Sequence, residues 1–382
     1  MLESSNLLRI PGPTPIPGCV TRAMSKPMIG HRTEEAKQLL IRLKEKIKPV
    51  FGTNQDVIIL AGSGSAGLEA AIVNITDVGD EVLVLVSGNF GERFAEICEV
   101  YGLKVHRIEV EWGKAIDPQE VEVYIQKNPN IKAVFVTSCE TSTGVLNPIP
   151  EITAAVREHS NALVAVDGVS SVGGVDTQMD AWGVDVLVTG SQKAMMLPPG
   201  LCFVAASERA WEVIHENKRP RYFLDLRKYL NNAAPYTPAV SLLMGLEAAL
   251  DLIAEEGLEN VYARHLTMME MTRAAVKALG IPLLTDEESA APTVTTLVPA
   301  DFEGDKLRKQ LKADFGLELA GGQKHLKGKV VRIGHMGYCA PADVLQVISL
   351  LETGLQRIGK DITPGQGIQA AQAVFLQSGG QA

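Results

Sequence analysis

Short apolar segments alternate with amphipathic segments along the first two-thirds of the chain. The apolar segments are apolar at almost every position rather than at every second one, which is typical of strands covered on both faces. The predicted strands are Val57–Ala61, Glu81–Val86, Val105–Val110, Ala133–Thr137, Leu163–Val166, Val184–Val188 and Leu201–Ala205. The predicted helices between them include Glu34–Val50, Ala66–Ile75, Glu92–Tyr101 and Pro150–His159. This alternation favours an α/β fold whose large domain holds a mainly parallel, seven-stranded sheet.

The pattern changes after Pro238 and predicts a smaller α+β domain. The elements predicted there are helices Val240–Glu256 and Leu258–Leu279, strand Thr293–Val298, helix Phe302–Phe315, strand Lys329–Ile333 and helix Pro341–Ile358. Four prolines between Pro11 and Pro17 predict an extended N-terminal segment. The sequence ends in a Gly/Gln-rich tail without a predicted element. We therefore expect an N-terminal arm (1–16), a large domain (17–260) and a small C-terminal domain (261–382).

The composition and net charge of the chain limit the classes of binding partner that it suits. The net charge of −9 and the isoelectric point near 5.4 disfavour nucleic acid and anionic membrane surfaces, although a local pocket for a small anion stays compatible with them. Five scattered cysteines without C-x-x-C spacing argue against a disulfide framework or a zinc site. We expect a cytoplasmic protein without a metal, because no signal peptide and no membrane-spanning apolar run is visible.

A glycine-rich string, Gly62 to Gly67, follows a predicted strand and begins a predicted helix. Glycines let the backbone approach an anion closely, and the N–H groups at a helix start point towards it. The string also satisfies G-x-G-x-x-G, with Asp80 and Glu81 near the spacing of a dinucleotide site. A structural turn, a dinucleotide site and a site for a single phosphate all remain open at this point.

Two ionisable residues follow strands at positions suited to chemistry. Asp167 closes a strand at its carboxyl end, where α/β sheets bind ligands, and a protonated ring nitrogen would neutralise it. A helix N-cap or a structural ion pair is the alternative. Lys193 follows a strand and precedes an apolar, proline-rich stretch, which favours a lowered pKa and a Schiff-base amine. Its alternative is an exposed loop lysine.

Arg332 stands alone within the apolar segment Val330–Gly334. A guanidinium there could bind a substrate carboxylate with two hydrogen bonds, or it could form a salt bridge between the domains. Taken together, a phosphate cradle, an acid 26 residues before a loop lysine and a late arginine are the groups that pyridoxal-phosphate (PLP) chemistry requires.

These motifs resemble the class V (fold type I) aminotransferases, specifically the alanine–glyoxylate and serine–pyruvate group. The matching strings are Pro11-Gly12-Pro13-Thr14, Gly30-His31-Arg32, Gly62-Ser63-Gly64 before Leu68-Glu69-Ala70-Ala71, Glu140-Thr141-Ser142-Thr143-Gly144, Asp167-Gly168-Val169-Ser170-Ser171, Gly190-Ser191-Gln192-Lys193-Ala194 and Arg332-Ile333-Gly334. They span nearly the whole chain in the order that the family has.

The resemblance implies the PLP-transferase fold of type I and a homodimer that binds PLP. Lys193 would form the Schiff base and carry the proton between the α-carbon and the cofactor, while Asp167 would pair with the pyridinium. The other implied cofactor contacts are Ser63, Gly64, Ser65 and Gln192 at the phosphate, Thr141 at the ring hydroxyl or phosphate, Val169 and Phe90 on the two ring faces, and Thr237 at the phosphate of the neighbouring subunit. Arg332 and Gly12 would contact the substrate.

One convincing arginine favours a small amino donor, alanine or serine, with glyoxylate or pyruvate as acceptor. Arg32 or a residue of the other subunit could supply a second cation, so aspartate and aminoethylphosphonate remain alternatives. A nicotinamide-dependent dehydrogenase and a non-catalytic dimeric binding subunit are the rival functions. A cysteine desulfurase would need a mobile cysteine nucleophile, and we assign Cys339 to structure instead.

Overall fold

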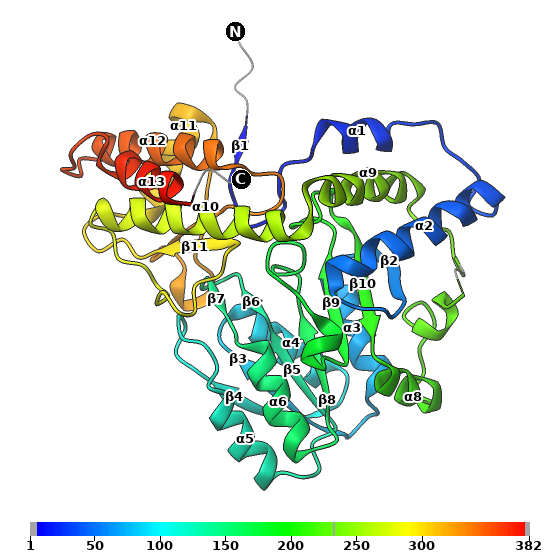
Figure 1. Ribbon diagram of the computed structural model, residues 1–382. Helices are drawn as coiled ribbons and strands as arrows, with labels where there is room; N and C mark the ends of the chain where they lie inside the picture. The colour runs from blue at the N-terminus through cyan, green and yellow to red at the C-terminus, as the bar shows by residue number, and fades with distance from the viewer. Residues whose placement is uncertain (1–5, 232–233, 379–382) are drawn as a thin grey trace.

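The computed structural model describes residues 6–231 and 234–378, and it divides into a large sheet-centred part and a smaller helical part (Figure 1). The central sheet has the strand order β2-β10-β9-β8-β5-β3-β4. In that order the strands span Val57–Gly62, Gly200–Ala206, Val186–Gly190, Leu163–Asp167, Ala133–Thr137, Glu81–Val86 and Lys104–Glu109. Only β10 runs antiparallel to its neighbours, so the predicted mainly parallel sheet of seven strands is confirmed.

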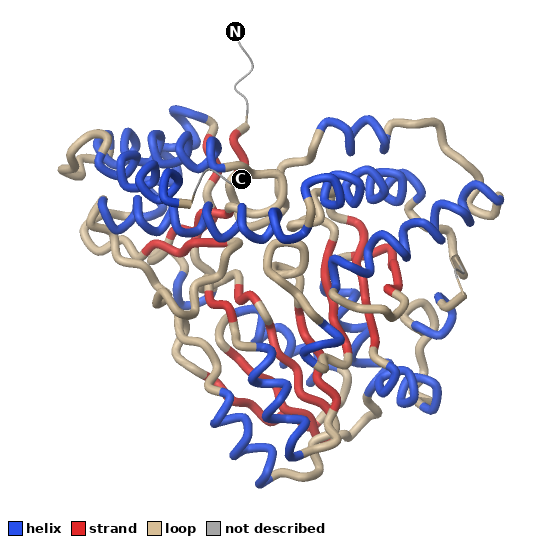
Figure 2. The backbone as a smooth tube through the Cα atoms, viewed as in Figure 1, coloured by secondary structure: helices blue, strands red, loops and turns tan. Residues whose placement is uncertain are grey.

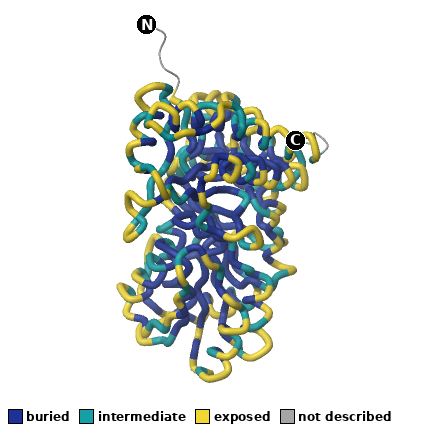
Figure 3. The backbone as a smooth tube through the Cα atoms, turned by 90° about the vertical axis from the view of Figure 1, so that its left-hand side faces the viewer, coloured by how far each residue is buried: buried dark blue, intermediate teal, exposed yellow. Residues whose placement is uncertain are grey.

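Helices cover both faces of this sheet, which explains why its strands are apolar throughout (Figure 2). One face packs against α3 (Gly64–Ile75), α4 (Asn89–Val100) and α8 (Glu208–Glu216). The other face packs against α2 (Glu34–Phe51), α5 (Pro118–Lys127), α6 (Ile149–His159) and α9 (Val240–Glu256). The backbone buried between these layers forms the core that Figure 3 shows in dark blue.

The sheet brings the chemical motifs to one edge. Strands β2, β5, β8 and β9 run in the same direction, so their carboxyl ends lie together. The glycine string follows β2, Asp167 ends β8 and Lys193 follows β9. Sequence segments more than a hundred residues apart therefore meet where α/β sheets bind their ligands.

The smaller part contains α10 (Leu258–Ala278), α11 (Gly304–Phe315), α12 (Pro341–Arg357) and α13 (Gln366–Gln377) around a three-stranded sheet. The sheet consists of β11 (Val294–Leu297), β14 (Val331–Gly334) and β13 (Ala320–Gly321). The N-terminal segment reaches this part too, since β1 (Leu7–Leu8) pairs in parallel with β12 (Leu317–Glu318). The domain limits drawn from the sequence stay a prediction.

Several short elements are absent from the sequence-based prediction. They are α1 (Gly18–Met24), α5, α7 (Met179–Trp182), α8, α13, the short strands β1, β12 and β13, the hairpin of β6 (Cys139–Glu140) and β7 (Val145–Leu146), and the 3-10 turns η1 (Leu226–Tyr229) and η2 (Lys324–Leu326). The tail is the clearest correction, because most of it forms α13, which buries Gly367 and Ala371. Residues 1–5 of the predicted arm and 379–382 of the predicted tail lie outside the described residues.

Candidate active site

A cavity of about 320 Å³ lies at the carboxyl edge of the central sheet, and we call it the lysine cavity. It brings together ten of the predicted residues, namely Gly12, Ser63, Gly64, Ser65, Phe90, Thr141, Asp167, Val169, Gln192 and Lys193. Its wall is completed by Pro13, Leu68, Arg93, Thr137, Cys139, Ser170 and Pro199, none of which was predicted as a site residue. The segments before α1 and after β2, β3, β5, β8 and β9 thus share one enclosure.

Lys193 is buried, so it is not the exposed loop lysine of the alternative interpretation. Burial lowers the pKa of its ammonium group to about 8, and the nearby Arg332 and Arg93 also disfavour its charge. Its Nζ donates a hydrogen bond to the carbonyl oxygen of Pro11. Because this pKa is about 8, a usable fraction of the lysine is neutral, nucleophilic amine at mildly alkaline pH.

Gly12 closes the cavity over this lysine. Its backbone has φ +106°, and a Cβ added there would lie 2.5 Å from Lys193 Cδ and 2.8 Å from Nζ. The next residues hold the same turn, because Thr14 Oγ1 donates to the Lys193 carbonyl oxygen over 2.9 Å. The N-terminal segment therefore forms part of the wall at the reactive amine, and only glycine leaves room for the lysine side chain.

Asp167 points into the same enclosure from the end of β8. Burial raises the pKa of its carboxyl group to about 6, whereas the N–H of Val169, the Lys193 ammonium and the Arg93 guanidinium hold it down. Val169 N donates to Asp167 Oδ1 over 2.9 Å. One carboxylate oxygen is therefore fixed by the backbone, and no salt bridge ties Asp167 to a cation among the described residues.

The start of α3 offers unpaired donors to the cavity. The Ser63 side chain makes no capping hydrogen bond, and the first backbone N–H groups, those of Gly64 and Ser65, have no acceptor among the described residues. Gln192 Oε1 and Thr137 Oγ1, also on the cavity wall, are buried without a partner there. Buried polar groups are normally paired, so the free N–H groups and the Thr137 hydroxyl are suited to an anionic end of a ligand. Gln192 Oε1, an acceptor, is suited to a water molecule or another donor.

Glu140 fixes the helix that carries Phe90, a role that the sequence did not reveal. Its fully buried carboxylate accepts hydrogen bonds from the N–H groups of Phe90 and Gly91, both over 3.0 Å, and from Ser142. Burial raises the pKa of this carboxyl group. Glu140 thus satisfies the free donors at the start of α4 and sets the position of Phe90.

Arg93 is the cation that sequence reasoning missed. It follows Phe90 by three residues on α4, lines the lysine cavity, and has its guanidinium carbon 4.7 Å from the centroid of the Phe90 ring. No carboxylate forms an ion pair with it among the described residues. The only sequence signal was its spacing from Phe90, which places both side chains on the same helix face.

Arg332 and Thr237 do not line the lysine cavity. Arg332 is buried beside it, where Nε donates to Gly321 O over 2.9 Å and Nη1 donates to Thr141 O over 2.8 Å. Burial lowers its pKa to about 10. Thr237 lines a separate small hollow next to Tyr236. Arg332 is thus linked to the cavity through Thr141, whereas Thr237 lies away from the lysine of its own chain.

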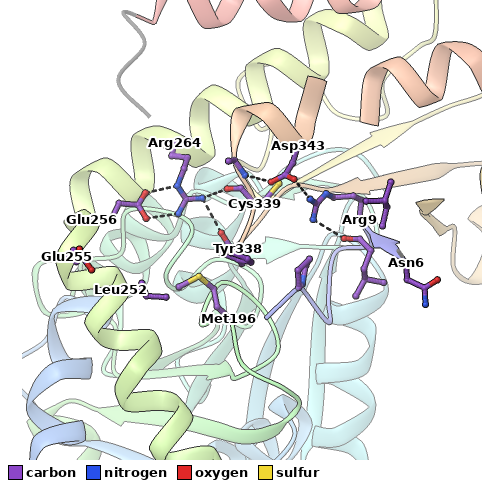
Figure 4. A pocket seen from close by; sticks show the side chains of 15 residues that line it. Asn6, Arg9, Met196, Leu252, Glu255, Glu256, Arg264, Tyr338, Cys339 and Asp343 are labelled. Carbon is purple, nitrogen blue, oxygen red and sulfur yellow. Dashed lines mark hydrogen bonds and ion pairs between the residues drawn. The ribbon is translucent and has the colours of Figure 1, made fainter. Parts of the chain in front are cut away.

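A larger cavity of about 680 Å³ lies on the other side of the Lys193 turn, and we call it the rear cavity. Met196 reaches it from that turn, and a Cβ added at Gly337 would lie 3.0 Å from the Lys193 carbonyl oxygen. Its two arginines are paired, Arg264 with Glu256 and Arg9 with Asp343, as the dashed lines in Figure 4 show. The other residues of its wall are Asn6, Leu7, Leu8, Pro15, Leu252, Glu255, Tyr338, Cys339 and Ala340.

Metal-binding clusters and membrane-spanning helices are both absent from the described residues. Among residues 6–231 and 234–378, no three His, Cys, Asp or Glu side chains are grouped so as to hold a metal ion. None of the helices in the same ranges has both the length and the apolar character required to cross a bilayer.

Comparison with known proteins decides the family. The profile of class-V aminotransferases matches residues 8–347. The chain belongs to the class-V aminotransferases. This membership confirms the resemblance, the fold type and the prediction of a PLP-dependent transaminase rather than a dehydrogenase. The role of the glycine string at a phosphate stays a prediction.

Relatives of this class-V aminotransferase carry names that denote different functions. It is 42% identical to the soluble hydrogenase small subunit of Synechococcus sp., over 98% of this chain and 99% of that one. It is 37% identical to the L-aspartate–glyoxylate aminotransferase of Paracoccus denitrificans (99% and 98%) and 36% identical to the serine–glyoxylate aminotransferase of Arabidopsis thaliana (97% and 95%). The solved ureidoglycine–glyoxylate aminotransferase of Bacillus subtilis superposes with a TM-score of 0.92 at 33% identity, covering 97% of each chain.

Proposed function

We propose that this aminotransferase moves an amino group from a small amino acid, alanine or serine, to glyoxylate or pyruvate, with PLP held in the lysine cavity. The observation that carries the proposal is the convergence of a buried lysine, a buried acid and unpaired donors at the start of α3 in one cavity. The similarity to the L-aspartate–glyoxylate aminotransferase of Paracoccus denitrificans and the serine–glyoxylate aminotransferase of Arabidopsis thaliana supports glyoxylate as the acceptor.

The residues of the cavity fit PLP. The free N–H groups of Gly64 and Ser65, together with the unpartnered Gln192 Oε1 and Thr137 Oγ1, are groups that a phosphate and its bound water would satisfy. Asp167 would keep a ring nitrogen protonated, and Phe90 and Val169 would pack against the ring. When bound there, PLP supplies an aldehyde for the amine and a ring that delocalises electrons from the substrate α-carbon.

Lys193 would carry both covalent attachment and proton transfer. Its lowered pKa provides neutral amine near pH 8, and the buried position keeps bulk water from the transferred proton. Nζ would be the group that takes the proton from the substrate α-carbon and holds it within the buried cavity for the transfer. Asp167, which lines the same cavity, would hold the ring nitrogen of the cofactor through its carboxylate.

Arg332 would bind the α-carboxylate of the amino acid. Two of its five N–H donors are used by Gly321 O and Thr141 O, which fix the plane of the guanidinium and leave the others for a ligand. Gly12, opposite the lysine, would limit the space for the substrate side chain and favour small donors.

Arg93 favours a second candidate donor, aspartate. A dicarboxylic amino acid needs a second cation, and Arg93 supplies one on the cavity wall without an ion-pair partner among the described residues. The deciding experiment measures kcat/KM for alanine, serine, aspartate and aminoethylphosphonate with glyoxylate and with pyruvate. A preference for aspartate in the wild type that is lost in Arg93→Gln would select the second candidate.

Thr237 supports a homodimer, because it lies outside its own chain's lysine cavity and would serve that of a second copy. Light scattering gives the mass of the assembly in solution. Co-purification of a Lys193→Ala chain with a Thr237→Ala chain provides the sharper test, since mixing should restore cofactor binding at one site in a shared dimer. A monomeric active enzyme would contradict this part of the proposal.

A further inference from the structure

The loop of residues 320–328 in the small part contacts α4 of the large part at several points. Asn89 Nδ2 donates to Gln323 Oε1 over 3.1 Å. Lys324 Nζ lies 3.0 Å from a carboxylate oxygen of Glu92 and 3.1 Å from one of Glu96. A single lysine thus bridges two successive turns of the helix that begins beside Phe90.

A ring contact follows at the next residue. The rings of His325 and Trp112 lie with their centroids 4.2 Å apart, and Trp112 belongs to the large part, between β4 and α5. Three consecutive residues of the loop therefore each reach across to the large part. We call these residues, Gln323, Lys324 and His325, the clasp.

The backbone of the clasp is held in an uncommon conformation. Lys324 has φ +48°, a left-handed conformation that costs a non-glycine residue free energy. Gly322 leaves no room for a side chain, because an added Cβ would lie 1.9 Å from the Leu326 carbonyl oxygen. Such a conformation persists only where the surrounding contacts determine it, and here it directs Lys324 towards α4.

The same loop orients the proposed substrate arginine. Gly321 O, two residues before the clasp, accepts the hydrogen bond from Arg332 Nε, and Ala320 pairs with Arg332 between β13 and β14. The clasp therefore links Arg332, the proposed carboxylate ligand, to the helix that carries Phe90, the proposed cofactor contact.

We propose that Lys324 is a positioning residue, which holds the Gly321 carbonyl and hence Arg332 at a fixed distance from the cofactor end of the lysine cavity. This inference rests on the proposed function. Lys324 is 47% exposed and Glu96 57% exposed, so each ion pair alone is weak. Together the two ion pairs favour one position of the loop relative to α4. Their loss should therefore change substrate binding more than the rate of the chemical step.

The experiment compares three variants of the holoenzyme. Lys324→Gln keeps a polar side chain, one atom shorter, but removes the charge. Lys324→Arg keeps the charge, and Lys327→Gln is the matched control on the same exposed loop. We expect Lys324→Gln to raise the KM for the amino donor about threefold to tenfold with kcat within about twofold of wild type, as the loss of two surface ion pairs predicts. Lys324→Arg should restore the wild-type KM.

Ionic strength provides the second measurement. Salt screens exposed ion pairs, so the KM of the wild type should rise more steeply with NaCl concentration than the KM of Lys324→Gln. The Lys327→Gln variant shows how much of the rise comes from screening of the charged substrate itself. A KM for Lys324→Gln equal to that of Lys327→Gln, or equal salt slopes, would overturn the proposal.

Hydrogen–deuterium exchange separates this inference from the proposed function. Peptides covering 320–328 should exchange faster in Lys324→Gln than in wild type and be unchanged in Lys324→Arg, whether or not any amino donor reacts. If the wild type shows no transamination with any donor, the proposed function fails. Unchanged exchange in Lys324→Gln refutes the clasp itself.

Discussion

The two cavities on either side of the Lys193 turn differ in how their polar groups are satisfied. The rear cavity is the larger, but its arginines already hold carboxylates and carbonyl oxygens of the chain. The lysine cavity is half its size and contains a cation without an ion pair, unpaired helix donors and two orphaned side-chain oxygens among the described residues. Unsatisfied polarity, rather than volume, therefore distinguishes the proposed ligand site from the rear cavity.

The largest effect is expected from removing the reactive amine. Lys193→Ala should reduce multiple turnover at least about a thousandfold, because both covalent attachment and proton transfer use the same nitrogen. Steady-state assays measure the loss. Mass spectrometry after borohydride reduction should locate the wild-type adduct on Lys193. Near-normal turnover of the variant, or an adduct elsewhere, would show that the lysine cavity is not the catalytic one.

A smaller effect is expected at the carboxylate site. Arg332→Ala should weaken binding of the amino donor by about 2–5 kcal/mol, since a desolvated guanidinium–carboxylate pair would be broken. The KM for the amino donor measures this change, and the affinity of the apoenzyme for PLP serves as the control, which should hardly move. An unchanged KM would place the substrate carboxylate at another cation, with Arg93 as the first residue to test.

The pH dependence of cofactor capture should report the burial of Lys193. Neutral amine is the nucleophile, and its fraction rises as the pH passes the pKa, which burial lowers to about 8. The rate at which the apoenzyme takes up PLP should therefore rise about tenfold from pH 6 to 7 and level off above pH 8. Rapid-mixing spectroscopy measures it. A rise that continues towards pH 10 would indicate a lysine exposed to water.

The smallest effect is expected in the rear cavity. Glu255 is exposed there and has no ion-pair partner among the described residues, so Glu255→Ala should change the free energy of unfolding by less than about 0.5 kcal/mol. Its kcat/KM should stay within about twofold of wild type. Thermal unfolding and the donor assay measure both. A clear loss of activity would show that the rear cavity takes part in the reaction, and the proposed difference between the rear cavity and the lysine cavity would then be wrong.

The central sheet and much of the site could be predicted because their signals are local. Apolar strands buried on both faces are visible in a few residues each. Asp167 ends one such strand, and Lys193 comes shortly after another. Arg93 and Glu140 could not be found in this way. Arg93 resembles any arginine on a helix, and the task of Glu140 depends on α4 lying against it, a contact between segments 50 residues apart.

The C-terminal tail shows a second limit of predicting structure from local sequence patterns. Helix α13 has few strong apolar residues, and its formation depends on packing against α10 and α12. Its start is held by Glu352, whose carboxylate accepts from the N–H groups of Gly365 and Gly367. Neither contact is visible in the tail's own sequence, so a helix stabilised by distant residues was interpreted as a loose end.

The contact between Pro11 and Lys193 has a consequence for biosynthesis. These residues are 182 positions apart, and β1, just before Pro11, pairs with β12, whose residues follow more than 300 positions later. The segment 7–11 therefore lacks these partners until first Lys193 and then Leu317–Glu318 have been synthesised. The central sheet can thus assemble before β12 exists, but the segment that covers Lys193 is anchored at both of its contacts only afterwards.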